Sequence, residues 1–182
     1  MSGPAPVGGP ALVVVGPPAS GKTTVGTAVA AALGLPFRDT DADVVAETGT
    51  SVADLFVEHG EPHFRELEQE AVARALAEHE GVLALGGGAV TSTATRELLV
   101  AHGRGGGPVV WLDVDVASAA KRVGLSRDRP LLAVNPRAML RTMLEARAPL
   151  YAEVSTCSVA TAARSVDEVV ADVLAAVGPV SR

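Results

Sequence analysis

The sequence predicts an α/β protein with a parallel sheet that is covered by helices on both faces. Short apolar runs with strand character occupy residues 11–15, 82–85, 109–112 and 155–160, and a weaker one occupies 36–38. Helical patterns separate these runs, and such alternation is typical of parallel strands joined by helical crossovers. Because most runs are apolar without interruption, the strands are expected to be buried on both faces.

The first run leads directly into a phosphate-binding motif. Residues 16–24 read Gly-Pro-Pro-Ala-Ser-Gly-Lys-Thr-Thr, which matches G-x-x-x-x-G-K-[ST]. Such a loop turns backbone N–H groups onto a phosphate, and the next helix adds its positive dipole end. Lys22 can then reach the outer phosphates, and the Thr23 hydroxyl can ligate Mg²⁺. The preceding strand and an Ala-rich helical pattern at 25–33 favour nucleotide binding over a chance Gly-rich turn.

Two carboxylates follow the weaker second run. Asp39 and Asp41 are two residues apart, so on an extended segment their side chains would point the same way. Ligands in open α/β sheets bind at the carboxyl ends of strands. One carboxylate could therefore serve the metal, directly or through water, and the other could accept a proton from a substrate hydroxyl. The alternative is an N-cap for a helix that begins near Asp43.

The clearest helical pattern spans about residues 62–78 and carries Arg65. Glu61 lies four residues before this arginine and Glu68 three residues after it. A surface ion-pair ladder of little energetic value is one interpretation. The other is an arginine held in one rotamer so that its planar fork can bind an anion. Helix spacing does not distinguish them.

Three glycines, Gly86, Gly87 and Gly88, follow the third run directly. Backbone without Cβ atoms can approach a ligand closely at a strand's end. A flexible turn is the alternative, although a turn needs fewer than three glycines.

Arginines gather in a segment with few apolar anchors, at about 122–134, which we interpret as a lid over the nucleotide. Arg122, Arg127 and Arg129 lie in it, and one of them could neutralise charge on a transferring phosphoryl group. A solvated basic loop is the alternative. Further on, Pro149 is expected to break a helix and so to place Arg147 at a helix end. A last helix is predicted near 166–177.

The composition fits one globular domain. The chain has 182 residues, 48% of them hydrophobic and only 3% aromatic, so the core is expected to consist of Val, Leu and Ala. The net charge of −6 argues against a nucleic-acid partner. We expect a disordered tail at residues 1–10, without the features of a signal peptide, and a single domain at 11–178.

The single cysteine, Cys157, excludes an intramolecular disulfide and fits a reducing compartment. No apolar stretch approaches the roughly 20 residues that span a bilayer. The sequence therefore predicts a cytoplasmic protein without a membrane partner.

Taken together, the motifs resemble those of the shikimate kinase family. The likeness extends from Ala11 to about Val177. The discriminating segments are Asp39-Thr40-Asp41, Phe64-Arg65, Gly86-Gly87-Gly88-Ala89-Val90, Arg129-Pro130-Leu131-Leu132 and Arg147-Ala148-Pro149-Leu150-Tyr151.

The resemblance implies a fold and an activity. The fold is a P-loop NTPase-type open five-stranded parallel sheet of order 2-3-1-4-5, with a substrate-binding region at about 40–70 and a lid. The activity is transfer of the ATP γ-phosphoryl group to the shikimate 3-hydroxyl, a step of aromatic amino acid biosynthesis, by a monomer that uses Mg²⁺.

The resemblance also implies residue roles. Arg65 and Arg147 would hold the shikimate carboxylate, and Asp41 with the backbone of Gly86–Gly88 would hold the ring hydroxyls. The implied catalytic residues are Lys22, Asp41 and Arg129, and the implied metal ligands are Thr23 and Asp39. The implied nucleotide-binding residues are Ala19, Ser20, Gly21, Lys22, Thr23, Thr24, Arg122, Arg129 and Arg164.

Three features depart from the family pattern. The Gly105–Gly107 run looks like a loop insertion away from the site. Ala19 replaces a common glycine, and a positive φ there would cost on the order of 1 kcal/mol. Ser165 stands where the family often has Asn.

The alternatives are a gluconate-type kinase of the same fold, which would not need the glycine run or the Arg65/Arg147 pair, and a catalytically silent nucleotide-binding module.

Overall fold

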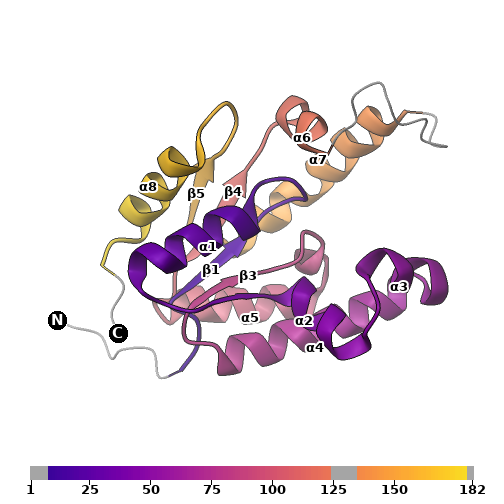
Figure 1. Cartoon of the computed structure of the whole chain (residues 1–182), viewed down its shortest axis with the longest axis horizontal. Helices are drawn as coiled ribbons and strands as arrows, with labels where there is room; N and C mark the ends of the chain where they lie inside the picture. Colours follow the sequence, from indigo (N-terminus) through magenta and orange to yellow (C-terminus); the bar gives the residue numbers. More distant parts are fainter. Residues whose placement is uncertain (1–7, 124–134, 180–182) are drawn as a thin grey trace.

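The computed structural model describes residues 8–123 and 135–179 (Figure 1). Most of the expected tail and most of the expected lid, including Arg127 and Arg129, lie outside the described residues. Pro10 is already buried at the start of the described chain.

Five parallel strands form one sheet of order β2-β3-β1-β4-β5, as the family resemblance implied. The strands are β1 (Leu12–Val15), β2 (Phe37–Asp39), β3 (Val82–Ala84), β4 (Val109–Asp113) and β5 (Cys157–Ala160). Each lies within or beside a run that the sequence marks as apolar. In the register, Val13 of the central strand lies between Leu83 and Val109.

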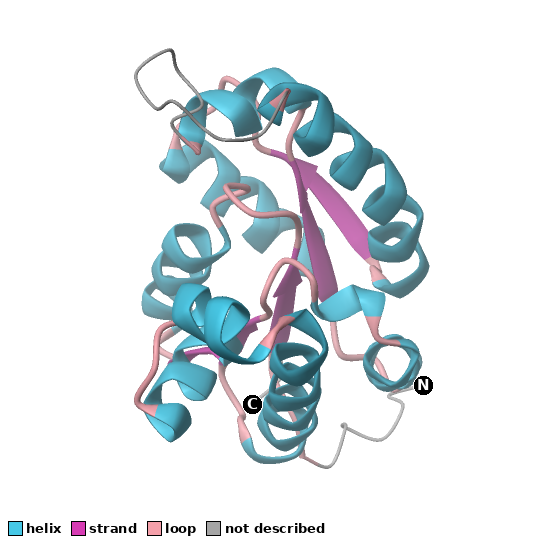
Figure 2. Ribbon diagram, turned by 90° about the vertical axis from the view of Figure 1, so that its right-hand side faces the viewer, coloured by secondary structure: helices cyan, strands magenta, loops and turns pink. Residues whose placement is uncertain are grey.

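Helices enclose the sheet on two sides (Figure 2). They are α1 (Lys22–Leu33), α2 (Thr40–Thr48), α3 (Val52–His59), α4 (Glu61–Glu78), α5 (Thr93–Arg104), α6 (Val116–Arg122), α7 (Pro136–Val154) and α8 (Val166–Val177), with a 3₁₀ turn η1 (Ala89–Thr91). Of the helices in the described ranges, none is long and apolar enough to cross a membrane.

Two apolar layers explain why β1 reads as an unbroken apolar run. Leu12 and Val14 pack against α1 and α8 on one face, whereas Val13 and Val15 pack against α4, α5 and α7 on the other. Alternate side chains of a strand point to opposite faces, so a strand that is covered twice needs apolar residues throughout.

A third, smaller cluster lies beside the sheet, where α2 and α3 pack on α4 (Figure 1). Its buried members are Val44, Leu55, Phe64 and Ala71. This cluster gives residues 40–70 an apolar support of their own next to the carboxyl ends of β2 and β3.

Two local expectations were wrong. Helix α2 begins at Thr40 rather than near Asp43, because Asp39 caps it by accepting a hydrogen bond from the Asp41 N–H at 2.9 Å. Helix α7 continues through Pro149 to Val154, so Arg147 lies within a helix and not at its end. A proline inside a helix removes one backbone hydrogen bond, and the packing of the following turn, where Tyr151 and Val154 are buried, offsets that loss.

Candidate active site

The phosphate loop connects β1 to α1 at the carboxyl edge of the sheet. Gly16 and Gly21 have φ angles of 156° and 93°, and Ala19 has a φ of 63°. Gly21 is the N-cap of α1 and has no side chain to bind the first N–H groups of the helix. Those N–H groups are therefore available to an anion, which is what a phosphate site requires.

Lys22 extends along this loop. Its ammonium donates a hydrogen bond to the Pro17 carbonyl at 2.9 Å. Burial lowers the pKa of Lys22 to about 8, although the nearby carboxylates of Asp41 and Asp39 oppose that shift. Within the described part of the chain, the ammonium forms no salt bridge, so its positive charge is available to a phosphate.

Thr23 and Asp39 lie side by side, as a pair of metal ligands would. The Thr23 hydroxyl donates to Asp39 Oδ2 at 2.9 Å, while Asp39 Oδ1 caps α2. A hydroxyl and a carboxylate are hard oxygen donors that suit Mg²⁺, which takes most of its remaining ligands from phosphates and water. The described residues contain no cluster of three or more His, Cys, Asp or Glu side chains able to hold a metal alone. The donor set therefore fits a metal that arrives with a nucleotide.

Asp41 points into the site from the first turn of α2, not from an extended segment. Its Oδ1 atom is buried and has no hydrogen-bond partner among the described residues. Burial, reinforced by the negative charge of Asp39, raises the pKa of Asp41. A buried carboxylate oxygen without a partner is costly unless a ligand completes it, so this atom marks a place for a substrate donor.

Arg65 is held on two sides by carboxylates. Its guanidinium donates to Glu68 Oε2 at 2.6 Å and to Glu61 Oε1 at 3.0 Å. The guanidinium also lies over the rings of Phe56 and Phe64, 5.8 and 5.4 Å from their centroids. Its side chain is only 22% exposed. Both predicted ion pairs are therefore present, and because the arginine is largely buried and held in one rotamer, the geometry favours the anion-binding interpretation over a solvent-exposed ladder.

Glu68 is a site residue that sequence reasoning treated only as an ion-pair partner. Its side chain is 3% exposed, and burial raises its pKa although Arg65 opposes the shift. An ideal Cβ placed on Gly86 would lie 2.5 Å from Glu68 Oε1 and 2.5 Å from Asp41 Oδ1. The two carboxylates therefore converge on the same stretch of backbone. A charged residue on a helix gives no sequence signal of such burial.

The glycines are needed because other atoms approach this backbone closely. Many of those atoms belong to the protein itself and not to a ligand. A Cβ on Gly87 would lie 2.8 Å from the Pro18 ring, and one on Gly88 would overlap the Arg65 guanidinium. The three glycines therefore let the phosphate loop, Asp41, Glu68 and Arg65 gather around one segment of backbone.

Helix α7 contacts this segment from the other side. Arg147 Nη1 donates to the Gly87 carbonyl at 3.3 Å, and the Tyr151 hydroxyl donates to the same oxygen. Tyr151 belongs to a motif that the sequence singled out, but its contact with Gly87, 64 residues away, could not be read from that motif.

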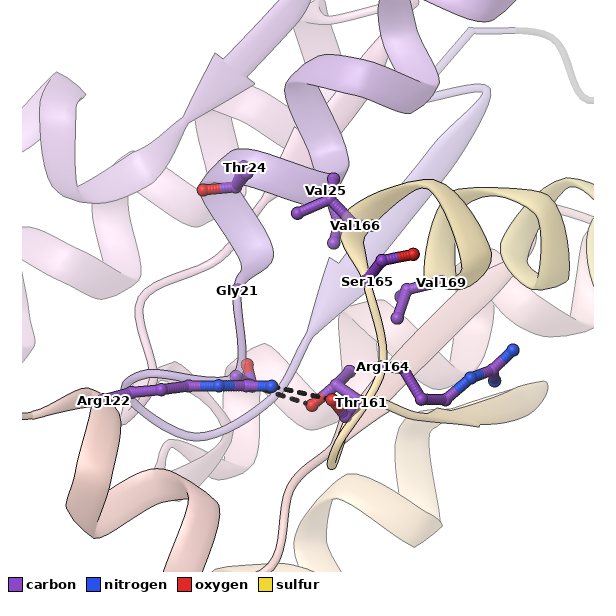
Figure 3. A pocket seen from close by; sticks show the side chains of 10 residues that line it. Gly21, Thr24, Val25, Arg122, Thr161, Arg164, Ser165, Val166 and Val169 are labelled. Atoms are coloured by element: carbon purple, nitrogen blue, oxygen red, sulfur yellow. Dashed lines mark hydrogen bonds between the residues drawn. The ribbon is translucent and has the colours of Figure 1, made fainter.

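A cavity of about 300 Å³ opens beside the phosphate loop, between Arg122 of α6 and the start of α8 (Figure 3). Arg122 donates to the Ala19 carbonyl at 3.1 Å and to the Thr161 carbonyl at 2.7 Å. Thr24, Val25 and Val169 also line the cavity.

Arg164 lines the same cavity but is engaged differently. Its guanidinium pairs with Asp172 of α8, and Figure 3 shows the side chain extending away from Arg122. Ser165 caps α8 in a reciprocal arrangement with Glu168, so this departure from the family pattern serves the helix start.

The described site brings together most of the predicted residues. At the carboxyl ends of β1, β2 and β3 the structure gathers Lys22, Thr23, Asp39, Asp41, Arg65, Gly86–Gly88 and Arg147. Arg122 lies across the phosphate loop from these residues. A phosphate loop with a half-buried lysine, a hydroxyl–carboxylate pair and a carboxylate oxygen without a partner defines a P-loop kinase that acts on a small molecule.

Comparison with known proteins identifies the family. The shikimate kinase family model matches residues 18–178. A curated shikimate kinase from Frankia casuarinae is 55% identical over 168 residues, which cover 92% of this chain and 72% of the relative. The chain therefore belongs to the shikimate kinase family and is an ATP-dependent phosphotransferase.

Solved structures agree with this assignment. A shikimate kinase from Acinetobacter baumannii, solved in complex with shikimate, superposes with a TM-score of 0.82 at 33% identity and covers 93% of this chain and 92% of its own. A gluconokinase from Sinorhizobium meliloti reaches a TM-score of 0.60 at 24% identity, with coverage of 95% and 92%. The latter likeness concerns the fold alone.

Proposed function

We propose that this chain transfers the γ-phosphoryl group of ATP to the 3-hydroxyl of shikimate, giving shikimate 3-phosphate and ADP, a step of chorismate and aromatic amino acid biosynthesis. The observation that carries the proposal is that Arg65, held in one rotamer by Glu61 and Glu68, and the unpaired Asp41 Oδ1 atom occur in the same site. The first suits a small carboxylate and the second suits a ring hydroxyl.

In this proposal Arg65 and Arg147, which both lie against the glycine run, bind the substrate carboxylate. The oxygen of the shikimate 3-hydroxyl bonds to the γ-phosphorus, and Asp41 accepts the proton that this hydroxyl loses. At the same time the bond between the γ-phosphorus and the bridging oxygen of ADP breaks. The raised pKa of Asp41 makes it a stronger base than a solvated aspartate. Lys22 stabilises negative charge on the phosphoryl group, a role that Arg129 of the lid would share.

The nucleotide base is assigned to the cavity between Arg122 and α8, with the phosphates on the loop at residues 19–24. Thr23 and Asp39 would hold Mg²⁺, which when bound offsets the charge of the β- and γ-phosphates. Arg164 also lines this cavity, and its guanidinium is paired with Asp172.

We further propose that the enzyme acts as a monomer in the cytoplasm. The family resemblance implies a monomer, and the single cysteine suits a reducing compartment. Light scattering after size exclusion would check the oligomeric state.

The decisive experiment measures ADP release from MgATP with shikimate, with gluconate and with neither. We expect turnover that requires shikimate. Arg65→Ala should raise KM for shikimate by about 10- to 100-fold, since a charged hydrogen-bonded anchor is lost. Arg74→Ala, on the same helix but paired with Glu47, is the matched control. ATP binding without shikimate-dependent turnover would overturn the proposal in favour of a silent nucleotide module, and turnover with gluconate would favour the gluconate-type alternative.

A further inference from the structure

The backbone of the glycine run is held in two different ways. The carbonyls of Gly86 and Gly88 accept local hydrogen bonds from Ala89 N–H and Thr91 N–H, both at 3.0 Å. The Gly87 carbonyl instead accepts from Tyr151 and Arg147, two side chains of α7 that are one helical turn apart. The orientation of the Gly87 peptide group therefore depends on α7.

Tyr151 occupies an unusual position for a tyrosine. The residue is 1% exposed and belongs to the core cluster of β1, β3, β4 and α7, whose other buried members are all Val, Leu or Ala. Its ring stacks on Trp111, with centroids 5.8 Å apart. Burial raises the pKa of Tyr151 to about 12, so the hydroxyl remains a proton donor. A phenylalanine would fill this space, and the hydroxyl therefore has a purpose beyond packing.

Arg147 by itself holds the Gly87 carbonyl loosely. Its Nη1 lies 3.3 Å from that oxygen, beyond the usual range of 2.7–3.2 Å for such bonds. The Tyr151 hydroxyl satisfies the same oxygen, so Arg147 can turn toward an anion without leaving the Gly87 carbonyl unpaired. Because a peptide group is planar, fixing the Gly87 carbonyl also fixes the direction of the Gly88 N–H.

We propose that Tyr151 is a positioning residue for the acceptor substrate: its buried hydroxyl fixes the Gly87–Gly88 peptide and keeps the Gly87 carbonyl paired when Arg147 turns from it to shikimate. This inference rests on the proposed function, in which Arg147 and the glycine run bind that substrate. It predicts an effect on the acceptor side of the reaction and none on the nucleotide side.

The test is Tyr151→Phe, which removes the hydroxyl and keeps the ring. KM for shikimate should rise about five- to tenfold, corresponding to the loss of one buried hydrogen bond. KM for MgATP should stay within twofold of the wild-type value. A merely structural role would lower Tm without separating the two KM values. The matched control is Thr156→Val, which removes hydrogen bonds between Thr156 and Val109 at the opposite end of the sheet.

A double-mutant cycle with Arg147→Lys separates the possible failures. If Tyr151 acts by keeping the Gly87 carbonyl paired when Arg147 turns to shikimate, the effect of Tyr151→Phe on KM for shikimate should shrink in the Arg147→Lys background. An Arg147→Lys variant with unchanged KM for shikimate would mean that the proposed site is wrong. A raised KM in Arg147→Lys together with no change in Tyr151→Phe would overturn this inference alone.

Binding can also be followed directly, since Trp111 is the only tryptophan of the chain and stacks on Tyr151. We expect shikimate to change the Trp111 fluorescence of the wild type, and the titration of Tyr151→Phe to give a weaker Kd by the same five- to tenfold factor. An unchanged Kd in a folded variant would contradict the inference, whatever its Tm.

Discussion

At the scale of single residues, Lys22 shows how the site uses burial. Its pKa of about 8 lies well below the ordinary value of 10.5, because removal of the ammonium from water outweighs the attraction of Asp41 and Asp39. Between pH 8 and 10.5 the folded protein has lost this proton and the unfolded chain keeps it, so this group makes stability rise with pH across that window.

Nucleotide binding should therefore take up a proton above pH 8. The phosphates favour the ammonium form and raise the pKa of Lys22 again, so at pH 9 binding of MgADP should take up as much as about one proton. Titration calorimetry in buffers of different ionisation enthalpy measures this number. The chain has only one other lysine, Lys121, and Lys121→Met should leave the uptake unchanged. Proton release on binding would be the contrary result.

Ala19 is a second residue with a measurable cost. Its φ of 63° lies in the left-handed region, where a Cβ is strained. Ala19→Gly should raise the free energy of unfolding by about 0.5–1 kcal/mol. Ala163, at φ 54° in the loop between β5 and α8, offers a matched comparison outside the phosphate loop. Denaturant unfolding measures the free energy of unfolding of Ala19→Gly and of Ala163→Gly. A loss of stability in Ala19→Gly would show that backbone strain is not the dominant effect.

At the scale of elements, the glycine run after β3 and helix α4 are fitted to each other. Since a Cβ on Gly88 would overlap the Arg65 guanidinium, Gly88→Ala should displace Arg65 from between Glu61 and Glu68. We expect KM for shikimate to rise at least tenfold, with a much smaller change in KM for MgATP. Steady-state kinetics with each substrate varied would test this.

Gly106→Ala is the control for that variant, because a Cβ there meets no atom within 4 Å, although its positive φ carries its own strain. If Gly106→Ala and Gly88→Ala altered KM for shikimate equally, the close packing against Arg65 would not be the cause.

At the scale of the whole molecule, a half-buried histidine of α5, His102, bears on acid stability. His102 Nε2 is buried, lacks a hydrogen-bond partner among the described residues, and packs against Gly107. Burial lowers the pKa of His102 below 6.5. The unfolded chain therefore binds this proton first, and stability falls as the pH drops below about 6.5.

His102→Asn should flatten that part of the pH profile. The difference in free energy of unfolding between wild type and variant should shrink as the pH falls from 7 to 5, because only the wild type must bury or deprotonate the imidazole. Denaturant melts at several pH values measure the difference. His63→Asn, at an exposed position on α4, is the matched control.

Sequence patterns alone predicted the buried parallel sheet, the phosphate loop and most of the residues that gather beside it, whose roles stay predictions. Strands covered on both faces must be apolar at every position, and a phosphate-binding loop needs glycines, a lysine and a hydroxyl at fixed spacing. Both features depend on residues that are close together in the sequence, so they can be predicted from it. The family resemblance added the strand order and the shikimate assignment. The expected lid around Arg129 stays a prediction.

Only the tertiary structure decided how those residues meet. Local spacing could not tell a caged Arg65 from a surface ladder, or place Asp41 on a helix, because the answers depend on packing between α2, α4 and the glycine run. The burial of Glu68 and the hydrogen bond from Tyr151 to Gly87 join segments far apart in the chain. Burial and long-range hydrogen bonds arise only when elements pack together, so they cannot be predicted from local periodicity in the sequence.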